Sequence, residues 1–481
     1  MNPVRFNNLC KDLDFILSLA DAPQIVANHY LHITNTHDKN IEKYQNSIFK
    51  AHLLFIYFNF INLAKILISA FRGGQYYEEG VIDNSAVLFV SHLTNNSQIY
   101  QSDDTYFGSL PKDLKLNNIE SNVALINHTK ISNKELHLNN KNKKISKFIL
   151  SPSLDFLSEI RLYYFQITSF IQLRKIVRRS KLSPRLKNNL FAYHFSPYTL
   201  SSIRISQQLS SIVKNNNYKV VITTYEGHSW ERVSYNSVRG INSNIKCFGY
   251  QHAAIFKYQH AIQRGIRKQF NPDIVFTSGL ISEFFLNESV ANMGIISCLG
   301  SPKYQDKRKL IVTDNIKCCL VAPEGIISEC VSLFEFSLIY AKQNKKQKFI
   351  WRLHPILNFN NIKKYIKGFD DIPENIIISR KDLDFDINRC DSVLYRGSTV
   401  VINAINNGLK PIYYKKNDNE LVVDPIHDIS SGKNIVCNVQ DLYSALHKQV
   451  KLQDREKLQE FSQKYYKPLN LHNLLIYMND Y

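Results

Sequence analysis

The chain has 481 residues, of which 44% are hydrophobic and 21% are charged. A single hydrophobic core stops growing well before this length, so we expect two domains, and the composition excludes a largely disordered chain. The formal net charge of +19 favours anionic partners such as phosphorylated or carboxylated sugars, nucleic acid or an acidic membrane surface, although a Lys- and Asn-rich composition without such a partner gives the same value.

Residues 1–80 are predicted to be helical, because apolar residues recur at helical spacing until Gly73 and Gly74. Residues 1–21 carry scattered charges, which is untypical of a signal peptide. Residues 51–71 are long enough to cross a membrane, but they include polar residues: His52, Asn59, Asn62 and Lys65. A buried helix, or one lying along a membrane surface, is therefore favoured over a true span.

The eight cysteines form no C-x-x-C pair, and several lie inside apolar runs. This pattern predicts buried free thiols and a reducing cytosol rather than a disulfide framework or a zinc site. The cysteines are Cys10, Cys247, Cys298, Cys318, Cys319, Cys330, Cys390 and Cys437.

The first strand signal lies at 86–90, and a second lies at 123–126 within a polar stretch from 112 to 147 that reads as surface loop. A helix is predicted at 154–173. It leads into a basic stretch that favours either a solvated helix face or contact with an anionic membrane or acceptor. The basic residues are Arg174, Lys175, Arg178, Arg179, Lys181, Arg185 and Lys187.

From residue 219 onward, short β-branched runs alternate with helical segments, which predicts βαβ units with a parallel sheet. Strands are expected at 220–222, 245–248, 273–276 and 295–296. Residues 303–315 read as a linker. Beyond it, strands are expected at 317–321, 349–353, 376–379, 392–395 and 411–414, and helices at 326–342 and 400–407.

The chain is therefore predicted to contain a helical extension (1–80), an α/β domain (81–302), a second doubly wound α/β domain (316–450) and a C-terminal helical segment (451–481). In open α/β sheets, ligands bind beyond the carboxyl ends of the strands. Residues that directly follow predicted strands are accordingly the candidates for a functional site.

Three loops of the second domain follow strands and carry groups that suit a phosphate. They contain Glu324 and Gly325; Arg352, His354 and Pro355; and Arg396, Ser398 and Thr399. Glycine permits close backbone approach, a cation and an imidazole attract an anion, and hydroxyls before a helix add donors. Each loop alone also fits an ordinary strand-to-helix corner, so the prediction depends on the three loops converging.

In the first domain, Glu226 and Glu231 follow one strand, and His252 follows the next. A group-transfer enzyme needs a side chain that takes a proton from the acceptor, or a carboxylate nucleophile. Glu226 and Glu231 are the candidates for this role, with His252 as an orienting or phosphate-facing partner. The alternative is a structural corner in which Glu231 pairs with Arg232.

The chain offers no convincing D-x-D metal site. Asp384 and Asp386 have the spacing, but they are expected in a charged loop before a strand, and we interpret them as structural. No metal and no other cofactor is therefore predicted.

An acidic residue with glycine, then His-Pro, then a Ser/Thr pair, in this order, resembles bacterial sialyltransferases and polysialyltransferases, and the Kdo and nonulosonate transferases of surface-carbohydrate biosynthesis. The first-domain segments around Glu226, Glu231 and His252 are similar to members of the same group. The resemblance covers about residues 85–425. Only one carboxylate precedes Gly325, where polysialyltransferases have two, and the first 80 residues have no clear counterpart.

The resemblance implies a GT-B fold, in which two Rossmann-like domains face each other across a cleft, and a metal-independent glycosyltransferase that uses a CMP-activated acidic sugar. It implies that His354, Ser398 and Thr399 contact the CMP phosphate, that Glu324 and Gly325 line the nucleotide, and that Glu226 faces the sugars. The expected partners are the CMP-sugar donor, a glycan or lipid-linked glycan acceptor, and the inner-membrane surface, with a cytoplasmic, peripheral location and no nucleic acid.

Two alternatives remain open at this point. A polyol-phosphate transferase of the CDP-glycerol type also places a histidine beside a proline at a phosphate site. A non-catalytic polyanion-binding protein would explain the charge of +19, although no nucleic-acid-binding module is recognisable.

Overall fold

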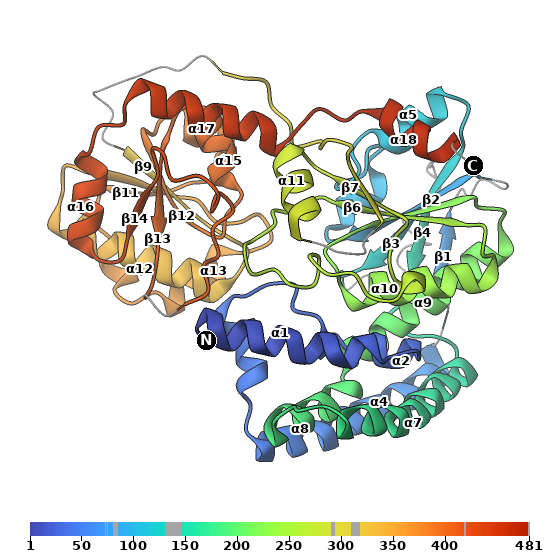
Figure 1. Ribbon diagram of the computed structural model, residues 1–481. Coiled ribbons are helices and arrows are strands. Elements are labelled where there is room, and N and C mark those ends of the chain that lie inside the picture. The colour runs from blue at the N-terminus through green and yellow to red at the C-terminus, as the bar shows by residue number, and fades with distance from the viewer. Residues whose placement is uncertain are drawn as a thin grey trace. The chain divides into compact units, whose positions relative to one another are not determined.

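The computed structural model describes residues 1–72, 74, 76–79, 85–129, 147–289, 294–308, 318–417 and 420–479. The chain forms two compact units (Figure 1). The N-terminal unit comprises Val4–Ala253, Gln259–Pro302 and Lys467–Tyr481, and the C-terminal unit comprises Met1–Pro3, Ala254–Tyr258 and Lys303–Tyr466. Each unit is described by itself.

The sheet of the N-terminal unit has eight strands among the described residues, in the order β1-β4-β3-β2-β5-β6-β7-β8. β1 is antiparallel to β4, and the other pairs are parallel. The strands are β1 (Tyr76–Glu79), β2 (Val87–Leu93), β3 (Ser121–Asn127), β4 (Lys147–Leu150), β5 (Val220–Thr224), β6 (Lys246–Gln251), β7 (Ile274–Thr277) and β8 (Ile295–Cys298). The strand order reverses between β2 and β5, which makes that position the topological switch point.

The parallel strands are continuous apolar runs because helices cover both faces of the sheet. The helices of this unit are α1 (Pro3–Ser18), α2 (Pro23–Val26), α3 (Asp38–Ile41), α4 (Ile48–Arg72), α5 (Leu110–Leu116), α7 (Phe156–Arg178), α8 (Pro184–His194), α9 (Pro197–Asn215), α10 (Ser229–Ile241), α11 (Leu280–Ser289) and α18 (Leu471–Asn479). α4, α7 and α8 pack on one another as a helical layer.

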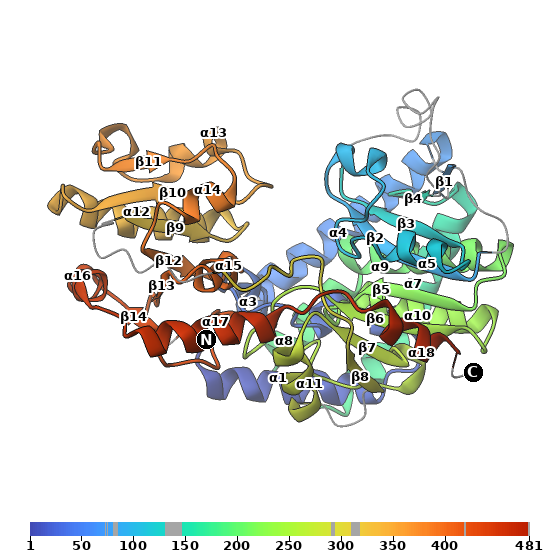
Figure 2. The ribbon, with the colours of Figure 1, turned by 90° about the horizontal axis from the view of Figure 1, so that it is seen from above.

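The last helix returns to the N-terminal unit and lies beside α5 (Figures 1 and 2). Leu474 of α18 is fully buried in the core of the eight-stranded sheet. The segment before α18 is bound to the same unit, because Lys467 N donates to Ser278 O at 3.0 Å and Asn470 N donates to Leu299 O at 2.8 Å. Residues 451–481, expected as one helical segment, are thus divided between the two units.

The C-terminal unit has a six-stranded parallel sheet in the order β11-β10-β9-β12-β13-β14. The strands are β9 (Cys318–Pro323), β10 (Lys348–Trp351), β11 (Ile376–Ile378), β12 (Ser392–Arg396), β13 (Lys410–Tyr414) and β14 (Asn434–Val436). The helices are α12 (Ile327–Gln343), α13 (Phe359–Ile362), α14 (Leu383–Ile387), α15 (Val400–Asn406), α16 (Val439–His447) and α17 (Leu452–Tyr465). When the six strands are numbered along the chain, their order across the sheet is 3-2-1-4-5-6. The switch point therefore lies between β9 and β12.

The predicted fold class is confirmed: two Rossmann-like α/β domains with parallel sheets and a helical N-terminal region. The expected linker is described only to residue 308, and its remainder lies outside the described residues. All eight cysteines are free, and six are buried as predicted, whereas Cys298 is half-buried and Cys437 is exposed.

Candidate functional site

A pocket of about 250 Å³ lies at the switch point of the N-terminal sheet, beyond the carboxyl ends of β2, β3, β5 and β6. It is lined by residues from the loops that follow these strands: His92, Thr94, Tyr106, His128, Thr224, Glu226, His228, Glu231 and His252. The structure therefore brings together the three first-domain residues singled out in the sequence, Glu226, Glu231 and His252.

Glu226 lies between two imidazoles, with its Oε1 3.4 Å from His252 Nε2 and its Oε2 3.8 Å from His228 Nε2. Its side chain is 25% exposed. Burial alone would raise the pKa of Glu226, but the two imidazoles outweigh burial and hold this pKa at about 2. Burial would lower the pKa of His228, but Glu226 and Glu231 raise it above its usual value. Glu226 is thus an ionised carboxylate at neutral pH, and it lies beside an imidazole whose pKa is raised.

Glu231 holds the Glu226 loop in place rather than facing the solvent. It is 1% exposed. Its carboxylate accepts from the backbone N of Glu226 (3.0 Å) and from that of His228 (2.8 Å), at the start of α10. Burial, with a contribution from Glu226, raises the pKa of Glu231 to about 7. The expected pair between Glu231 and Arg232 does not form, because Arg232 donates to the carbonyls of Ala261 and Arg264.

Sequence reasoning assigned no role to three histidines of this pocket: His92, His128 and His228. His92 Nδ1 lies 2.9 Å from His128 Nε2, and His92 Nε2 lies 3.0 Å from the Thr224 hydroxyl. Burial and the adjacent imidazoles lower the pKa of His92 to about 3, and burial also lowers that of His128. His92 and His128 each lie shortly after a predicted strand. The rule that singled out Glu226 would therefore have found them.

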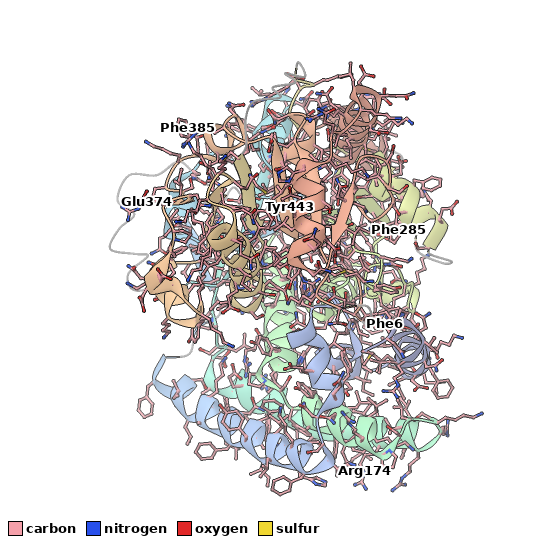
Figure 3. All side chains as sticks on the ribbon, turned by 90° about the vertical axis from the view of Figure 1, so that its left-hand side faces the viewer. Phe6, Arg174, Phe285, Glu374, Phe385 and Tyr443 are labelled. Atoms are coloured by element: carbon pink, nitrogen blue, oxygen red, sulfur yellow. The ribbon has the colours of Figure 1, made fainter. Side chains whose placement is uncertain are left out.

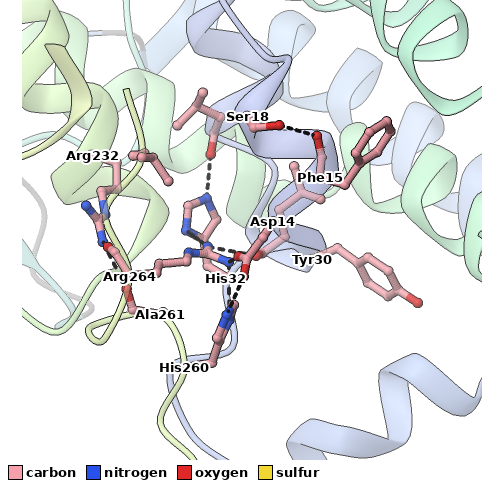
Figure 4. Close-up of polar contacts among 12 residues, drawn as sticks. Asp14, Phe15, Ser18, Tyr30, His32, Arg232, His260, Ala261 and Arg264 are labelled. Atoms are coloured by element: carbon pink, nitrogen blue, oxygen red, sulfur yellow. Dashed lines mark hydrogen bonds and ion pairs between the residues drawn. The ribbon is translucent and has the colours of Figure 1, made fainter. Parts of the chain in front are cut away.

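The segment 259–271 packs against the Glu226 loop and holds it in place. Gly227 has a φ of +79°, and a Cβ at this position would lie 2.3 Å from the carbonyl of Ala261. Only glycine fits this close approach. The same segment is tied to the N-terminal helices: Asp14 of α1 contacts His260 at 2.9 Å and Arg264 at 3.1 Å (Figure 4). The helical extension therefore supports the loop that positions Glu226.

In the C-terminal unit, the loops after the adjacent strands β9, β10 and β12 converge. A Cβ on Gly397, whose φ is +71°, would lie 2.2 Å from Glu324 Oε1, and a Cβ on Gly325 would lie 3.2 Å from His354 Nδ1. Ile356 N donates to His354 Nδ1 at 3.3 Å. Burial and Lys303 lower the pKa of His354. Glu324, Gly325, His354 and Gly397 thus share one edge of the sheet, at its switch point.

Details of these loops differ from the predictions. β9 extends to Pro323, and β10 ends at Trp351, so Arg352 and His354 lie beyond the strand and strand alternation does not orient them. Pro355 is exposed in the turn that follows. Ser398 is 3% exposed, and neither Ser398 nor Thr399 caps α15 with its side chain.

Both arginines of the predicted phosphate site are engaged by carboxylates. Arg396 is 1% exposed, and its guanidinium contacts Glu329 at 2.7 Å and Glu420 at 2.8 Å. Arg352 contacts the buried Asp386 at 2.7 Å. Because buried carboxylates take up these guanidinium groups, we leave Arg396 out of the proposed site and assign Arg352 to positioning its loop.

Among the described residues, no group of three or more His, Cys, Asp or Glu side chains is arranged to hold a metal ion. The D-x-D residues lie in α14 rather than in a loop. Asp386 accepts from Ser379 at 2.6 Å, and Asp384 contacts Arg308 at 2.7 Å, so both have structural partners.

No family model and no curated protein matches the chain. Among solved structures, it is similar to the glycotransferase of kitacinnamycin (8% identity, 82% of this chain and 100% of that chain, TM-score 0.46). It is also similar to the glycosyltransferase SnogD from Streptomyces nogalater (9%, 82% and 100%, TM-score 0.44) and to UDP-GlcNAc 2-epimerase from Methanocaldococcus jannaschii (12%, 81% and 99%, TM-score 0.42). At these identities and TM-scores, the likenesses support no conclusion about substrate or reaction.

Proposed function

We propose that the chain is a glycosyltransferase that moves an acidic sugar, Kdo or another ulosonic acid, from a CMP donor to a surface-polysaccharide or lipid-linked acceptor. The observation that carries the proposal is that both doubly wound sheets place a polar cluster at their switch point. Switch points are where open α/β sheets bind ligands. One cluster suits proton transfer and an acidic sugar, and the other suits a nucleotide phosphate.

In the N-terminal unit, Glu226 is the group that accepts the proton of the acceptor hydroxyl. The carboxylate lines the pocket and lies 3.4 Å from His252 Nε2, and the proton is passed to that imidazole. His228, whose pKa the adjacent carboxylates raise, is the imidazole that pairs with the carboxylate of an ulosonic acid. The volume of about 250 Å³ is small for a ligand pocket and suits one sugar unit.

In the C-terminal unit, the backbone at Gly325 and Gly397 and the imidazole of His354 bind the leaving phosphate. Where the three loops meet, the Glu324 carboxylate packs against Gly397, and the side chains of Ile356 and His354 pack against Gly325. Departure of CMP requires stabilisation of negative charge, which N–H groups and an imidazole provide. Ser398, Thr399 and Glu324 lie on the same loops. We expect no metal requirement, which is checked by measuring turnover after treatment with EDTA.

A thermal-shift panel of CMP, CDP, UDP and GDP tests the proposal. CMP is expected to raise the melting temperature of the intact chain, because a ligand at about 100 times its Kd stabilises by about 2.7 kcal/mol. His354→Ala is expected to abolish the shift. His447→Ala, which alters an exposed histidine of the same unit, is the matched control. Stabilisation by UDP alone, or turnover with CDP-glycerol but no CMP-ulosonate, would reject the proposed donor.

A further inference from the structure

The outer surface of α4 and α7 is covered with large apolar side chains, which we call the α4–α7 face. On α4 these are Phe49, Leu53, Ile56, Tyr57, Phe60, Leu63, Leu67, Ile68 and Phe71, and on α7 they are Phe156, Leu157, Ile160, Tyr164, Phe165, Ile167 and Ile171. All are at least 39% exposed, and Phe60 reaches 70%. Monomeric proteins rarely expose a continuous apolar surface of this extent unless it binds something.

The orientation of α4 is fixed by polar contacts on its opposite side. Asn62 is 1% exposed and donates to Phe195 O at 2.7 Å, and Asn59 accepts from the hydroxyl of Tyr163 on α7 at 2.5 Å. Phe55 packs edge-on against Phe195 at 5.3 Å. Asn59 and Asn62 in the middle of α4 thus face the protein while large apolar side chains around them face away, which is the reverse of an ordinary surface helix.

These contacts also decide between crossing a membrane and lying on one. By length and composition alone, Ile48–Phe71 is able to cross a membrane. However, Asn59 and Asn62 bind α4 laterally to α7 and to the residue that follows α8, and Lys65 lies beside the buried Arg204–Glu159 pair. A helix held along its length in this way lies in the plane of the surface that it meets.

The charge of the helical layer is of one sign. α4 and α8 contain no Asp or Glu, and the one acidic residue of α7, Glu159, is buried and paired with Arg204 at 2.7 Å. Exposed basic side chains gather where α7 ends and α8 begins: Arg174, Lys175, Arg178, Arg179, Lys181 and Arg185. Arg174 extends into solvent from this end of α7 (Figure 3). The apolar face is therefore bordered by cations with no exposed carboxylate on the same helices.

We propose that the α4–α7 face docks on a bilayer that contains anionic phospholipids. Its apolar side chains enter the headgroup–acyl boundary, and the basic cluster binds the lipid phosphates. A second copy of the chain fits the face less well. A two-fold contact would set the face against itself, and neither helix offers an exposed carboxylate to the basic cluster. The inference is independent of the reaction proposed above.

Sedimentation with vesicles tests the proposal. The intact chain is expected to bind vesicles of equal parts phosphatidylcholine and phosphatidylglycerol more tightly than vesicles of phosphatidylcholine alone. Phe60→Glu with Leu67→Glu is expected to lower the partition coefficient about 100-fold, because two large apolar side chains no longer insert. Arg174→Glu with Arg178→Glu is expected to lower it about 10-fold on the anionic vesicles and to leave binding to the neutral ones unchanged.

Leu116→Glu and Phe284→Glu provide the matched control, since both alter exposed apolar side chains on other helices of the same unit. Unchanged vesicle binding by this control, with equal melting temperatures for all variants, supports the proposal. Vesicle binding that is equal in the intact chain and in Phe60→Glu/Leu67→Glu overturns it. So does a dimer in solution that binds no vesicles and that the same two substitutions convert to a monomer.

Discussion

Replacing Glu226 with Gln tests the chemistry proposed for the N-terminal pocket. The substitution keeps the shape of the side chain and removes its charge. At 3.8 Å from His228 and an effective dielectric constant of about 20, the attraction between the carboxylate and a protonated imidazole is about 4 kcal/mol. Because Glu226 is a quarter exposed, this value is an upper bound. Without the Glu226 carboxylate, Glu231 alone opposes the effect of burial on His228, so the pKa of His228 falls.

Two measurements follow from this reasoning. Transferase turnover is expected to fall by about 10²- to 10⁴-fold, the range found when a general base is removed. NMR titration of ¹³C-labelled histidines is expected to show that the pKa of His228, raised in the intact chain, is lower in the variant. Glu288→Gln, an exposed residue of α11, is the control for both. A fall of less than 10-fold with an unchanged His228 titration would refute the role of Glu226.

Three further predictions concern CMP binding and stability. Gly397→Ala places a Cβ 2.2 Å from Glu324 Oε1 at a φ of +71°, so it is expected to weaken CMP binding more than 10-fold, or by about 1.4 kcal/mol or more, in isothermal calorimetry. Gly240→Ala is the control, because no atom lies within 4 Å of the added Cβ, and it is expected to leave CMP binding unchanged. Equal losses of CMP binding in the two variants would contradict the loop geometry. Arg396→Met leaves Glu420 buried without its cation and Glu329 with Lys416 alone, and it is expected to lower the unfolding free energy by about 3–5 kcal/mol in urea titrations. Lys342→Met breaks the exposed pair with Asp371 and is expected to lower the unfolding free energy by at most about 1 kcal/mol. Similar losses of unfolding free energy in the two variants would argue that the pairs of Arg396 are not buried. Finally, burial lowers the pKa of six histidines in the N-terminal unit: His29, His32, His92, His128, His194 and His260. A group with a lowered pKa loses stability as pH falls below its unfolded value, so each such histidine is expected to lower the unfolding free energy below pH of about 6.5, by at most about 1.4 kcal/mol per pH unit. A melting temperature that stays constant from pH 7 to pH 5 would show that these imidazoles are not buried neutral.

The fold class was predictable because parallel strands buried on both faces leave continuous β-branched runs. Val220 to Ile222 and Ser392 to Tyr395 are such runs, and both are strands in the structure. β1, β4 and β14 were missed because they are short strands within or beside polar sequence. The pairing of β4 with β3 depends on the sheet rather than on local pattern.

The candidate sites were predictable only in position along the chain. Glu226, His252 and His354 lie beyond strand ends, as the rule for open α/β sheets requires. Sequence alone did not reveal which neighbouring groups each side chain would contact. Arg396 stands among phosphate-binding candidates in the sequence, yet two carboxylates brought in from 67 residues before it and 24 residues after it take up its guanidinium. Such partners are set by tertiary packing.

The return of the chain end to the N-terminal unit has a consequence for biosynthesis. A ribosome delivers the first 302 residues well before residues 467–481, and Lys303–Tyr466, the main part of the C-terminal unit, is made in between. Until α18 emerges, the place of Leu474 in the core is vacant and the carbonyl of Leu299 lacks the backbone donor from Asn470. The unit synthesised first is therefore completed last, which leaves its nascent form exposed to chaperones and proteases throughout translation of the other.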